Sequence, residues 1–400
     1  MTPSVLPPSP ELKRSYEVVI VGGGVHGLSL AYNLARAGRS DVAVFERSYI
    51  GAGASGRNLS LIRSSWQQRA WAALVWYARG LWSTISVELG YNVMFTERGS
   101  YLCIGQRASL PAVEAALATQ AEIGIPTRFV SVDELRRRLP QLDTTGMAGA
   151  VHDPTAGVSR HDALVWAYAR AAARLGVHVH PQTAVTGMEL AGERVARVRT
   201  SRGDVATDIV VNCAGSESAE VAALAGASVP TRKLTLEMFV TEPYAAFLTP
   251  IVSVIDDQAY IMQTSRGEFV GGAEPVGHFG RPGLATSYAA LRQSAATMAR
   301  LFPRLRGVNV LRAWAGLIDM TPDGAGLVGE LEERPGFFLD CGWGGEGYMV
   351  APATGRLGAE YLNTGTLDER LAPFHHSRFE TGDLLDDSLL VVDAAGETRG

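Results

Sequence analysis

The chain has 400 residues, of which 46% are hydrophobic, enough to bury a large core in two domains or in one elaborated domain. Its net charge is −5 and its 36 basic residues form no stripe, which argues against a nucleic-acid partner. No apolar run reaches membrane-spanning length, and residues 1–15 are Pro-rich and polar where a secretory signal would be apolar. The three cysteines match no zinc-ligand spacing. We expect a cytoplasmic globular protein without a metal site.

The segment 16–47 predicts a nucleotide-binding β-α-β unit. A buried strand at 18–21 ends on glycines, and a helix follows from about 26 to 37. Gly22, Gly24 and Gly27 fit G-x-G-x-x-G, which provides a tight turn, close approach to a pyrophosphate and close helix packing. Glu46 follows a second strand and is placed to bind an adenosine ribose. A purely structural turn is the alternative, and Glu46 does not choose between NAD and FAD.

Small residues and then polar ones follow in the segment 51–66. Arg57, Asn58 and Arg63 come after a glycine-rich stretch that lets backbone approach a ligand closely. The arginines are suited to phosphate, a flavin ring or a substrate carboxylate. A surface loop with solvated arginines is the alternative.

The first half of the chain predicts alternating helices and strands. The expected elements are, in order, a core helix at 68–89, a hairpin at 95–105 turning near 97–99, a helix at 112–123, a capping box at 131–134 with a short helix ended by Pro140, a helix within 153–176 with Asp162 as N-cap or first-turn acid, and strands at 177–180 and 208–215.

From about residue 229 the pattern changes to longer alternating strands, which predicts an antiparallel sheet that covers a ligand. The expected strands are 233–242, 253–255, 259–263 and 268–272, followed by a helix at 287–302 and a closing helix at 353–362. The predicted class is therefore α/β (α+β by some schemes), a Rossmann-like domain interleaved with an antiparallel-sheet substrate domain. The expected division is 15–95, 150–228 and 308–372 for the nucleotide domain, 96–149 and 229–307 for the substrate domain, and 1–14 and 373–400 for terminal arms.

Several motifs in this order resemble one family. They are the unit 22–46, Gly56-Arg57-Asn58 with Ile62-Arg63, Ala156-Gly157-Val158 with Arg160-His161-Asp162 and Trp166, Trp314 with Thr321-Pro322-Asp323, Cys341-Gly342-Trp343-Gly344, and Arg378-Phe379-Glu380-Thr381-Gly382. Together they resemble the D-amino-acid-oxidase-like superfamily of FAD-dependent amine oxidoreductases, and within it the sarcosine oxidase β subunits of the heterotetrameric type. The first motif is shared by many flavoproteins, and the others are more specific.

The resemblance implies an FAD site. The residues expected to bind the cofactor are Gly22, Gly24, Val25, His26, Gly27, Glu46, Arg47, Ala54, Ser55, Arg57, Asn58, Ile62, Val185, Gly215, Gly344, Gly347 and Met349. Gly316 stands where monomeric relatives attach FAD through a cysteine, so the resemblance implies non-covalent FAD.

His161 matches the position that carries covalent FMN in the heterotetrameric enzymes, so the resemblance implies FMN as a second cofactor; a histidine that caps or packs a helix is the alternative. Val270 replaces the lysine with which monomeric relatives activate oxygen. Met349 replaces the lysine that shares a substrate carboxylate with an arginine, here Arg63. Proline dehydrogenase and opine oxidase subunits of the family also have methionine at this place, so the resemblance leaves the substrate open.

The leading interpretation is FAD-dependent oxidation of a sarcosine-like amine, a secondary or primary amino or imino acid, to an imine that hydrolyses. Electrons would pass to oxygen or another acceptor, directly or through FMN. Arg63, Tyr260 and Tyr348 are the candidate catalytic residues. One alternative is a flavin-bearing or scaffolding subunit of a hetero-oligomeric amine dehydrogenase of the proline or opine type, inactive without partner subunits. Another is an NAD-dependent dehydrogenase.

Overall fold

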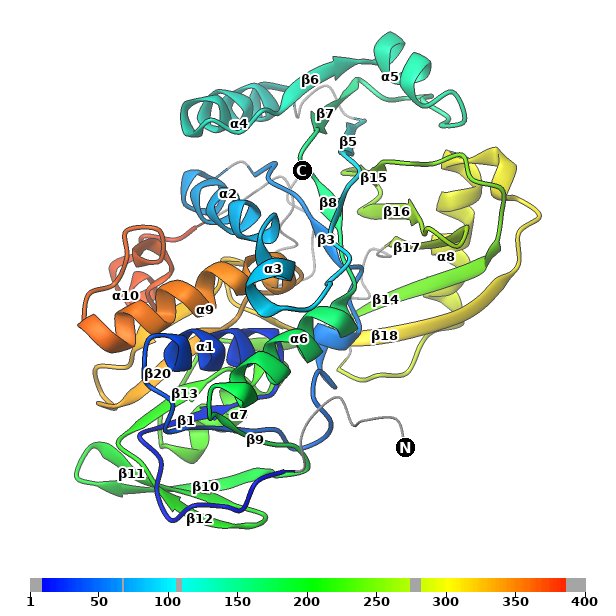
Figure 1. Cartoon of the computed structure of the whole chain (residues 1–400). Coiled ribbons are helices and arrows are strands. Elements are labelled where there is room, and N and C mark those ends of the chain that lie inside the picture. The colour runs from blue at the N-terminus through cyan, green and yellow to red at the C-terminus, as the bar shows by residue number, and fades with distance from the viewer. Residues whose placement is uncertain (1–8, 67, 106–109, 274–281, 386–400) are drawn as a thin grey trace.

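The computed structural model describes residues 9–66, 68–105, 110–273 and 282–385. In this part of the chain the strands form a six-stranded sheet, an eight-stranded sheet and two three-stranded sheets. Figure 1 shows the six-stranded sheet in the lower half of the molecule and most of the eight-stranded sheet in the upper right. Parallel and antiparallel sheets with helices between them confirm the predicted α/β class.

The six-stranded sheet carries the nucleotide-binding unit. Its order is β19-β20-β13-β1-β2-β9, and all neighbours are parallel except β19 and β20. Every residue of β1 and β2 is buried, as expected for strands covered on both faces. The strands are β1 (Val18–Val21), β2 (Val42–Phe45), β9 (His178–His180), β13 (Ile209–Asn212), β19 (Leu327–Glu330) and β20 (Phe337–Cys341).

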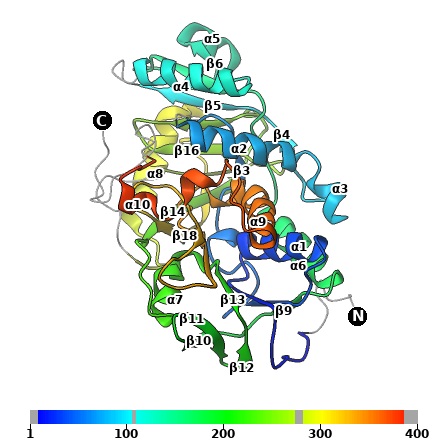
Figure 2. The same cartoon turned by 90° about the vertical axis from the view of Figure 1, so that its left-hand side faces the viewer.

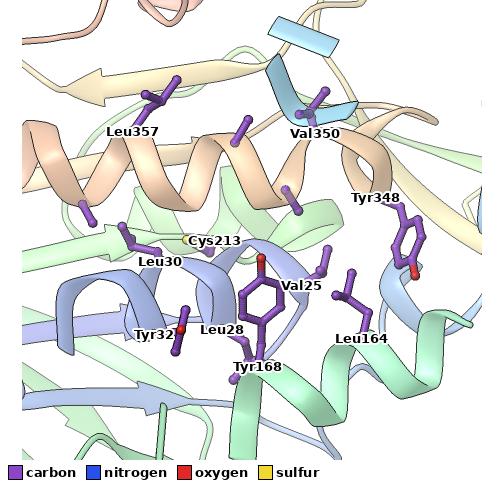
Figure 3. Packing of buried hydrophobic residues seen from close by; sticks show 14 of the residues in the cluster. Val25, Leu28, Leu30, Tyr32, Leu164, Tyr168, Cys213, Tyr348, Val350 and Leu357 are labelled. Carbon is purple, nitrogen blue, oxygen red and sulfur yellow. The ribbon is translucent and has the colours of Figure 1, made fainter. Parts of the chain in front are cut away.

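Helices cover one face of this sheet and a small sheet covers the other. On the first face α1 lies between α6 and α9 (Figure 3). Helix α2 packs on α9. The helices are α1 (Val25–Arg36), α2 (Arg69–Trp82), α6 (His161–Arg174) and α9 (Gly347–Thr364). The other face is covered by α7 (Ser218–Leu224), β10 (Val185–Ala191), β11 (Arg194–Thr200) and β12 (Gly203–Ala206).

The eight-stranded sheet has the order β18-β14-β17-β16-β15-β5-β7-β6 and is antiparallel except between β15 and β5. Its outer face packs on α8 (Tyr288–Leu301) and α5 (Val132–Arg138) through a separate apolar core. Its strands are β5 (Ser100–Ile104), β6 (Arg128–Ser131), β7 (Gly149–Asp153), β14 (Arg232–Pro243), β15 (Ile251–Val254), β16 (Ala259–Gln263), β17 (Glu268–Ala273) and β18 (Val310–Met320).

The remaining elements join these layers. Figure 2 shows α4 and α5 at the opposite end of the molecule from β10–β12. The expected capping box is present, because the Ser131 hydroxyl accepts a hydrogen bond from the Glu134 amide at the start of α5. The remaining bounds are β3 (Leu61–Ile62), β4 (Thr96–Glu97), β8 (Gly157–Val158), α3 (Ile85–Leu89), α4 (Leu110–Ile123) and α10 (Arg378–Thr381).

Three local predictions need correction. The hairpin expected at 95–105 does not form, because β4 pairs with β8 while β5 pairs with β7 and β15. Partners distant in sequence outweigh the local alternation there. The closing helix begins at Gly347 rather than at residue 353, and it continues through Pro352 because the first turns of α9 are buried against the core. Residues 373–385 of the expected arm 373–400 are packed on the protein, where buried Arg378 and the Leu385 amide both bind Asp323, and residues 386–400 lie outside the described residues.

The expected domain boundaries also shift. Residues 310–320 form β18, which pairs along its length with β14 and so belongs to the covering sheet rather than to the nucleotide segment 308–372. Strand β7 pairs with β5 and β6, so residues 150–153 also lie in the covering sheet. In the expected arm 1–14, residues 1–8 lie outside the described residues.

Candidate functional site

The turn between β1 and α1 is a cradle that side chains would fill. Gly22 has a φ of +116°, and a Cβ there would lie 2.3 Å from the carbonyl oxygen of Cys213. A Cβ on Gly27 would lie 2.2 Å from the carbonyl oxygen of Gly22, so the helix packs directly on the turn. The N-cap residue of α1 is Gly24, which has no side chain to cap the helix, so the helix N-terminus and its dipole face the cavity, where they are suited to an anion.

Glu46 closes one side of the turn. Its Oε2 accepts a hydrogen bond from the Gly23 amide at 3.0 Å, and its Oε1 accepts one from the Ser48 amide at 2.8 Å. The Val25 amide donates to the Ser55 hydroxyl at 2.9 Å, which ties the loop after β2 to the start of α1. These contacts fix the turn and the carboxylate in one arrangement.

A cavity of about 1040 Å³ extends from this turn to the eight-stranded sheet. Its size is at the upper end of the range for small-molecule pockets, which suits a dinucleotide with a second ligand. The predicted site residues that line it are Gly22, Gly24, Val25, His26, Glu46, Arg47, Ala54, Ser55, Arg57, Asn58, Arg63, Val185, Gly215, Tyr260, Gly344, Gly347, Tyr348 and Met349.

Three predicted cofactor residues lie outside the cavity lining. Gly27 is in α1 behind the turn, where its role is close packing. The resemblance implies that Ile62 lines FAD, but its side chain is buried in the apolar core between the helices, while its neighbour Leu61 lines the cavity. Adjacent strand residues point to opposite faces, so only one of the two faces the cavity. His161 lies behind Ser60, which lines the cavity, and its Nδ1 is 3.0 Å from the Ser60 hydroxyl oxygen.

Arg57 lines the cavity beside β18. Its Nε donates to the Ala52 carbonyl at 3.1 Å, and its own carbonyl accepts a hydrogen bond from the Trp314 indole at 3.0 Å. A Cβ on Gly316 would lie 3.4 Å from the Arg57 Cβ, so Gly316 faces this arginine. Within the described residues no carboxylate pairs with Arg57, so its charge remains available to a ligand.

Arg63 is buried at the cavity wall and has three partners. Its Nη2 donates to Glu346 Oε1 at 3.2 Å, and its Nη1 donates to the Ser65 carbonyl at 3.1 Å. The guanidinium also lies over the Trp66 ring, 4.1 Å from the ring centroid. This pairing joins two chain segments that both line the cavity.

Tyr348 forms another part of the wall. It lies at the start of α9 (Figure 3), and its hydroxyl is 2.5 Å from the Ser159 hydroxyl. Burial raises the pKa of the Tyr348 phenol above its usual range. The phenol therefore stays protonated at neutral pH and cannot act there as a base.

His26 connects α1 to the turn before α9. Its Nδ1 is 3.0 Å from Asp340 Oδ1, and its Nε2 is 3.0 Å from the Gly347 carbonyl oxygen. Burial disfavours the charged imidazole, but the Asp340 carboxylate outweighs burial and raises the pKa of His26. Trp343 stacks on the ring and donates its indole N–H to Asp340. The network holds the loop 343–347 against the nucleotide turn.

Other lining residues escaped prediction from the sequence. Leu236 and Met238, on one face of β14, and Leu317 of β18 line the cavity, and strand alternation alone does not tell which face is covered. Asp319 also lines it, and burial raises the pKa of its carboxyl to about 6. Glu346 lies two residues after the motif Cys341-Gly342-Trp343-Gly344, yet its partner Arg63 is remote in sequence.

Three features define a dinucleotide-dependent oxidoreductase. They are the glycine turn at the N-terminus of α1, the acid at the end of β2, and a cavity covered by the eight-stranded sheet. The chain belongs to the FAD dependent oxidoreductase family DAO, whose model matches residues 17–361. It is thus an FAD-dependent oxidoreductase, and the glycine cradle, Glu46 and the large cavity fit that cofactor.

Known proteins of this family are similar along nearly the whole chain. The sarcosine oxidase subunit beta of Rhodobacter capsulatus is 32% identical over 390 residues, covering 95% of this chain and 92% of its own. The same subunit from Arthrobacter sp is 31% identical and covers 96% of each chain. The structure of L-proline dehydrogenase from P. horikoshii matches with a TM-score of 0.88 at 28% identity, covering 93% of this chain and 100% of its own. Glycine oxidase from Geobacillus kaustophilus matches with a TM-score of 0.83 at 25% identity, covering 92% and 99%.

None of the helices in the described ranges is long and apolar enough to cross a membrane. Among those same residues no group of three or more His, Cys, Asp or Glu side chains is arranged to hold a metal ion.

Proposed function

We propose that the protein oxidises a primary or secondary amine with non-covalently bound FAD. The observation that carries this proposal is the continuity of one cavity from the glycine turn to Arg63, Tyr260 and Tyr348. FAD, when bound, takes a hydride equivalent from the carbon next to a neutral amine nitrogen, and the imine product hydrolyses. The relatives are named for sarcosine, proline and glycine, which supports an amine and makes amino and imino acids the first substrates to test.

The nucleotide end of the site would hold FAD by backbone and charge. The amides at the start of α1 and the small residues of the turn accommodate a pyrophosphate, and Glu46 accepts hydrogen bonds from a ribose. Gly316 offers no thiol for a covalent bond and faces Arg57, whose charge is suited to the electron-rich flavin ring. These assignments explain why the cofactor would be released on denaturation.

The substrate end combines polar groups with an apolar wall. Tyr260 projects from β16, and Arg63 and Tyr348 line the opposite side with the helices. Leu236, Met238 and other apolar side chains from the covering sheet limit the entry of water. A dry site favours the neutral amine over the ammonium ion, which is the form that oxidation requires.

The proposal is tested by mixing the purified protein anaerobically with a panel of primary and secondary amines. At least one amine should bleach the flavin absorbance and yield the corresponding carbonyl compound after hydrolysis. A flavin that no amine reduces would contradict amine oxidation, and the same spectra would show whether the flavin is present at all.

We also propose that His161 carries FMN covalently. Nδ1 of His161 contacts Ser60, which lines the cavity, so the histidine lies one residue layer from the FAD site. Burial lowers the pKa of the His161 imidazole more than the neighbouring Asp162 raises it, which keeps the ring neutral and nucleophilic at neutral pH. Mass spectrometry of the denatured protein should show an added FMN that is absent from His161→Asn. An unmodified wild-type mass would contradict this assignment.

Partner subunits form a further part of the proposal. The similar proteins from Rhodobacter capsulatus and Arthrobacter are named as subunits, which supports an assembly with other chains. Val270, in place of the lysine of monomeric relatives, supports an acceptor other than oxygen at FAD. Oxygen consumption by the isolated chain should be slow and should rise when an artificial electron acceptor is supplied. Fast oxygen turnover by the chain alone would contradict both points.

A further inference from the structure

The arginine at the substrate end of the cavity is already paired with a carboxylate of the same chain. Arg63 donates to Glu346 Oε1 at 3.2 Å, and both residues line the cavity. The Arg63 side chain is only 10% exposed, so a large share of this charge pairing takes place away from bulk solvent. The ring of Trp66 covers one face of the guanidinium, and the Ser65 carbonyl accepts a further hydrogen bond. Arg63 therefore offers little unneutralised charge to a ligand.

The Glu346 side chain makes no helix cap, and Arg63 is its ion-pair partner among the described residues. Glu346 is the N-cap residue of α9, but its side chain makes no capping hydrogen bond. Glycines at 344, 345 and 347 surround it, so neighbouring side chains do not cover it. Its side chain is 28% exposed, and among the described residues Oε2 accepts no hydrogen bond. One carboxylate oxygen thus neutralises Arg63 while the other is available to a hydrogen-bond donor.

The ion pair between Glu346 and Arg63 disfavours the binding of a substrate carboxylate at Arg63. An arriving carboxylate would have to displace Glu346 from Arg63 and then lie beside the displaced like charge. Among the described residues the other cations of the cavity do not take over this role. Position 349 is methionine, Arg47 pairs with Glu217, and Arg57 lies beside β18, where its charge is assigned to the flavin ring. An amine without a carboxylate leaves the pair intact, and its ammonium form is attracted by Glu346 as it enters.

We propose that Glu346 makes the site selective for amines that carry no free carboxylate, such as secondary alkylamines and amino alcohols. This inference rests on the proposed function and narrows its substrate class. It separates this chain from the relatives named for sarcosine and proline, whose substrates bear a carboxylate beside the reacting amine. Glu346 is a specificity-determining residue in this account, and its charge rather than its size is what matters.

The test compares N-methylglycine with 2-(methylamino)ethanol, in which a neutral hydroxymethyl group replaces the carboxylate. Each is titrated anaerobically into the holoenzyme, and binding is followed by the flavin difference spectrum before reduction and by the rate of bleaching afterwards. Acetate serves as a third ligand that binds without reacting. The wild type should bind 2-(methylamino)ethanol at least about tenfold more tightly than N-methylglycine, a factor that corresponds to about 1.4 kcal/mol.

Glu346→Gln removes the charge and keeps the shape. It should lower the dissociation constants of N-methylglycine and acetate by about tenfold or more, since Arg63 regains its free charge. Glu97→Gln is the matched control, because Glu97 pairs with buried Arg79 outside the cavity, and this change should leave the ligand ratio as it is in the wild type.

The outcomes separate the two proposals. A wild type that prefers N-methylglycine, or a Glu346→Gln ratio equal to that of the wild type, overturns the inference while reduction by either amine upholds the proposed function. If Glu346→Gln does not fold, the wild-type protein alone tests the inference. The two quantities are the ratio of its dissociation constants for N-methylglycine and 2-(methylamino)ethanol, and its dissociation constant for acetate. A flavin that responds to none of the three ligands overturns the inference, and the panel of primary and secondary amines then decides the proposed function separately.

Discussion

The guanidinium of Arg378 donates to both carboxylate oxygens of Asp323, at 2.7 and 2.9 Å, in a pair that is almost completely buried. Asp323 also accepts hydrogen bonds from the amides of Ala325 and Leu385. One carboxylate therefore ties the segment before β19 to the last described residues of the chain. This relationship accounts for the two motifs around Asp323 and Arg378 as parts of one structural unit.

Arg378→Leu should lower the free energy of unfolding by about 3–5 kcal/mol, because it leaves the Asp323 carboxylate buried without its partner. Urea unfolding followed by circular dichroism measures the loss. Arg199→Leu is the control, since Arg199 pairs with Glu189 at the surface and its removal should change stability little. Equal losses in the free energy of unfolding of the two variants would show that the buried ion pair contributes no more to stability than the surface pair.

Gly22→Ala should abolish most FAD binding. The added Cβ would overlap the Cys213 carbonyl, and the φ of +116° is unfavourable for alanine, so the turn must move away from the phosphate position. The ratio of flavin absorbance to protein absorbance in the purified variant measures the effect. Gly80→Ala in α2 is the control, where a Cβ meets open space, and it should keep its flavin and gain about 1 kcal/mol of stability.

Stability should fall as the pH drops below neutrality because of His180. Its Nε2 is 3.1 Å from the Tyr16 hydroxyl oxygen, and burial, with the charges of Arg202 and His178, lowers its pKa to about 4. A histidine whose pKa is depressed in the folded protein stabilises the fold above its unfolded pKa of about 6.5. That contribution is lost as the pH falls from about 6.5 to about 4.

Urea unfolding at pH 7.5 and at pH 5 measures this dependence. The wild type should be less stable at the lower pH, and His180→Gln should show a smaller difference between the two because it has no proton to take up there. A variant whose pH dependence equals that of the wild type would exclude His180 as the cause.

Tyr348→Phe should lower the stability of the protein without changing the shape of the pH profile of amine oxidation. Loss of the phenol leaves the Ser159 hydroxyl without its partner and should cost about 0.5–1.5 kcal/mol of stability. Because burial keeps the phenol protonated, the profile of amine oxidation between pH 7 and pH 10 should keep its shape in the variant. A basic limb present in the wild type and missing from the variant would instead assign proton transfer to Tyr348.

Local sequence patterns predicted the strand, the glycine turn and the helix at the nucleotide end of the cavity, and the structure contains these elements. The three glycines, the buried strand and Glu46 lie within one continuous segment, so their geometry follows from local rules. The substrate end depends on partners far apart in the chain. Glu346 approaches Arg63 only in the folded protein, and a two-residue strand at Ile62 gives no alternation from which its buried orientation could be read. The resemblance pointed to segments that line the cavity, and the fold decides which of their side chains face it.

The most direct test of the account is the absorbance spectrum of the purified protein before and after acid precipitation, with chromatography of the supernatant. Flavin bands in the native spectrum and free FAD in the supernatant are the predicted result. A colourless protein with no FAD in the supernatant, whose cavity accepts NAD on titration, would contradict the central claim.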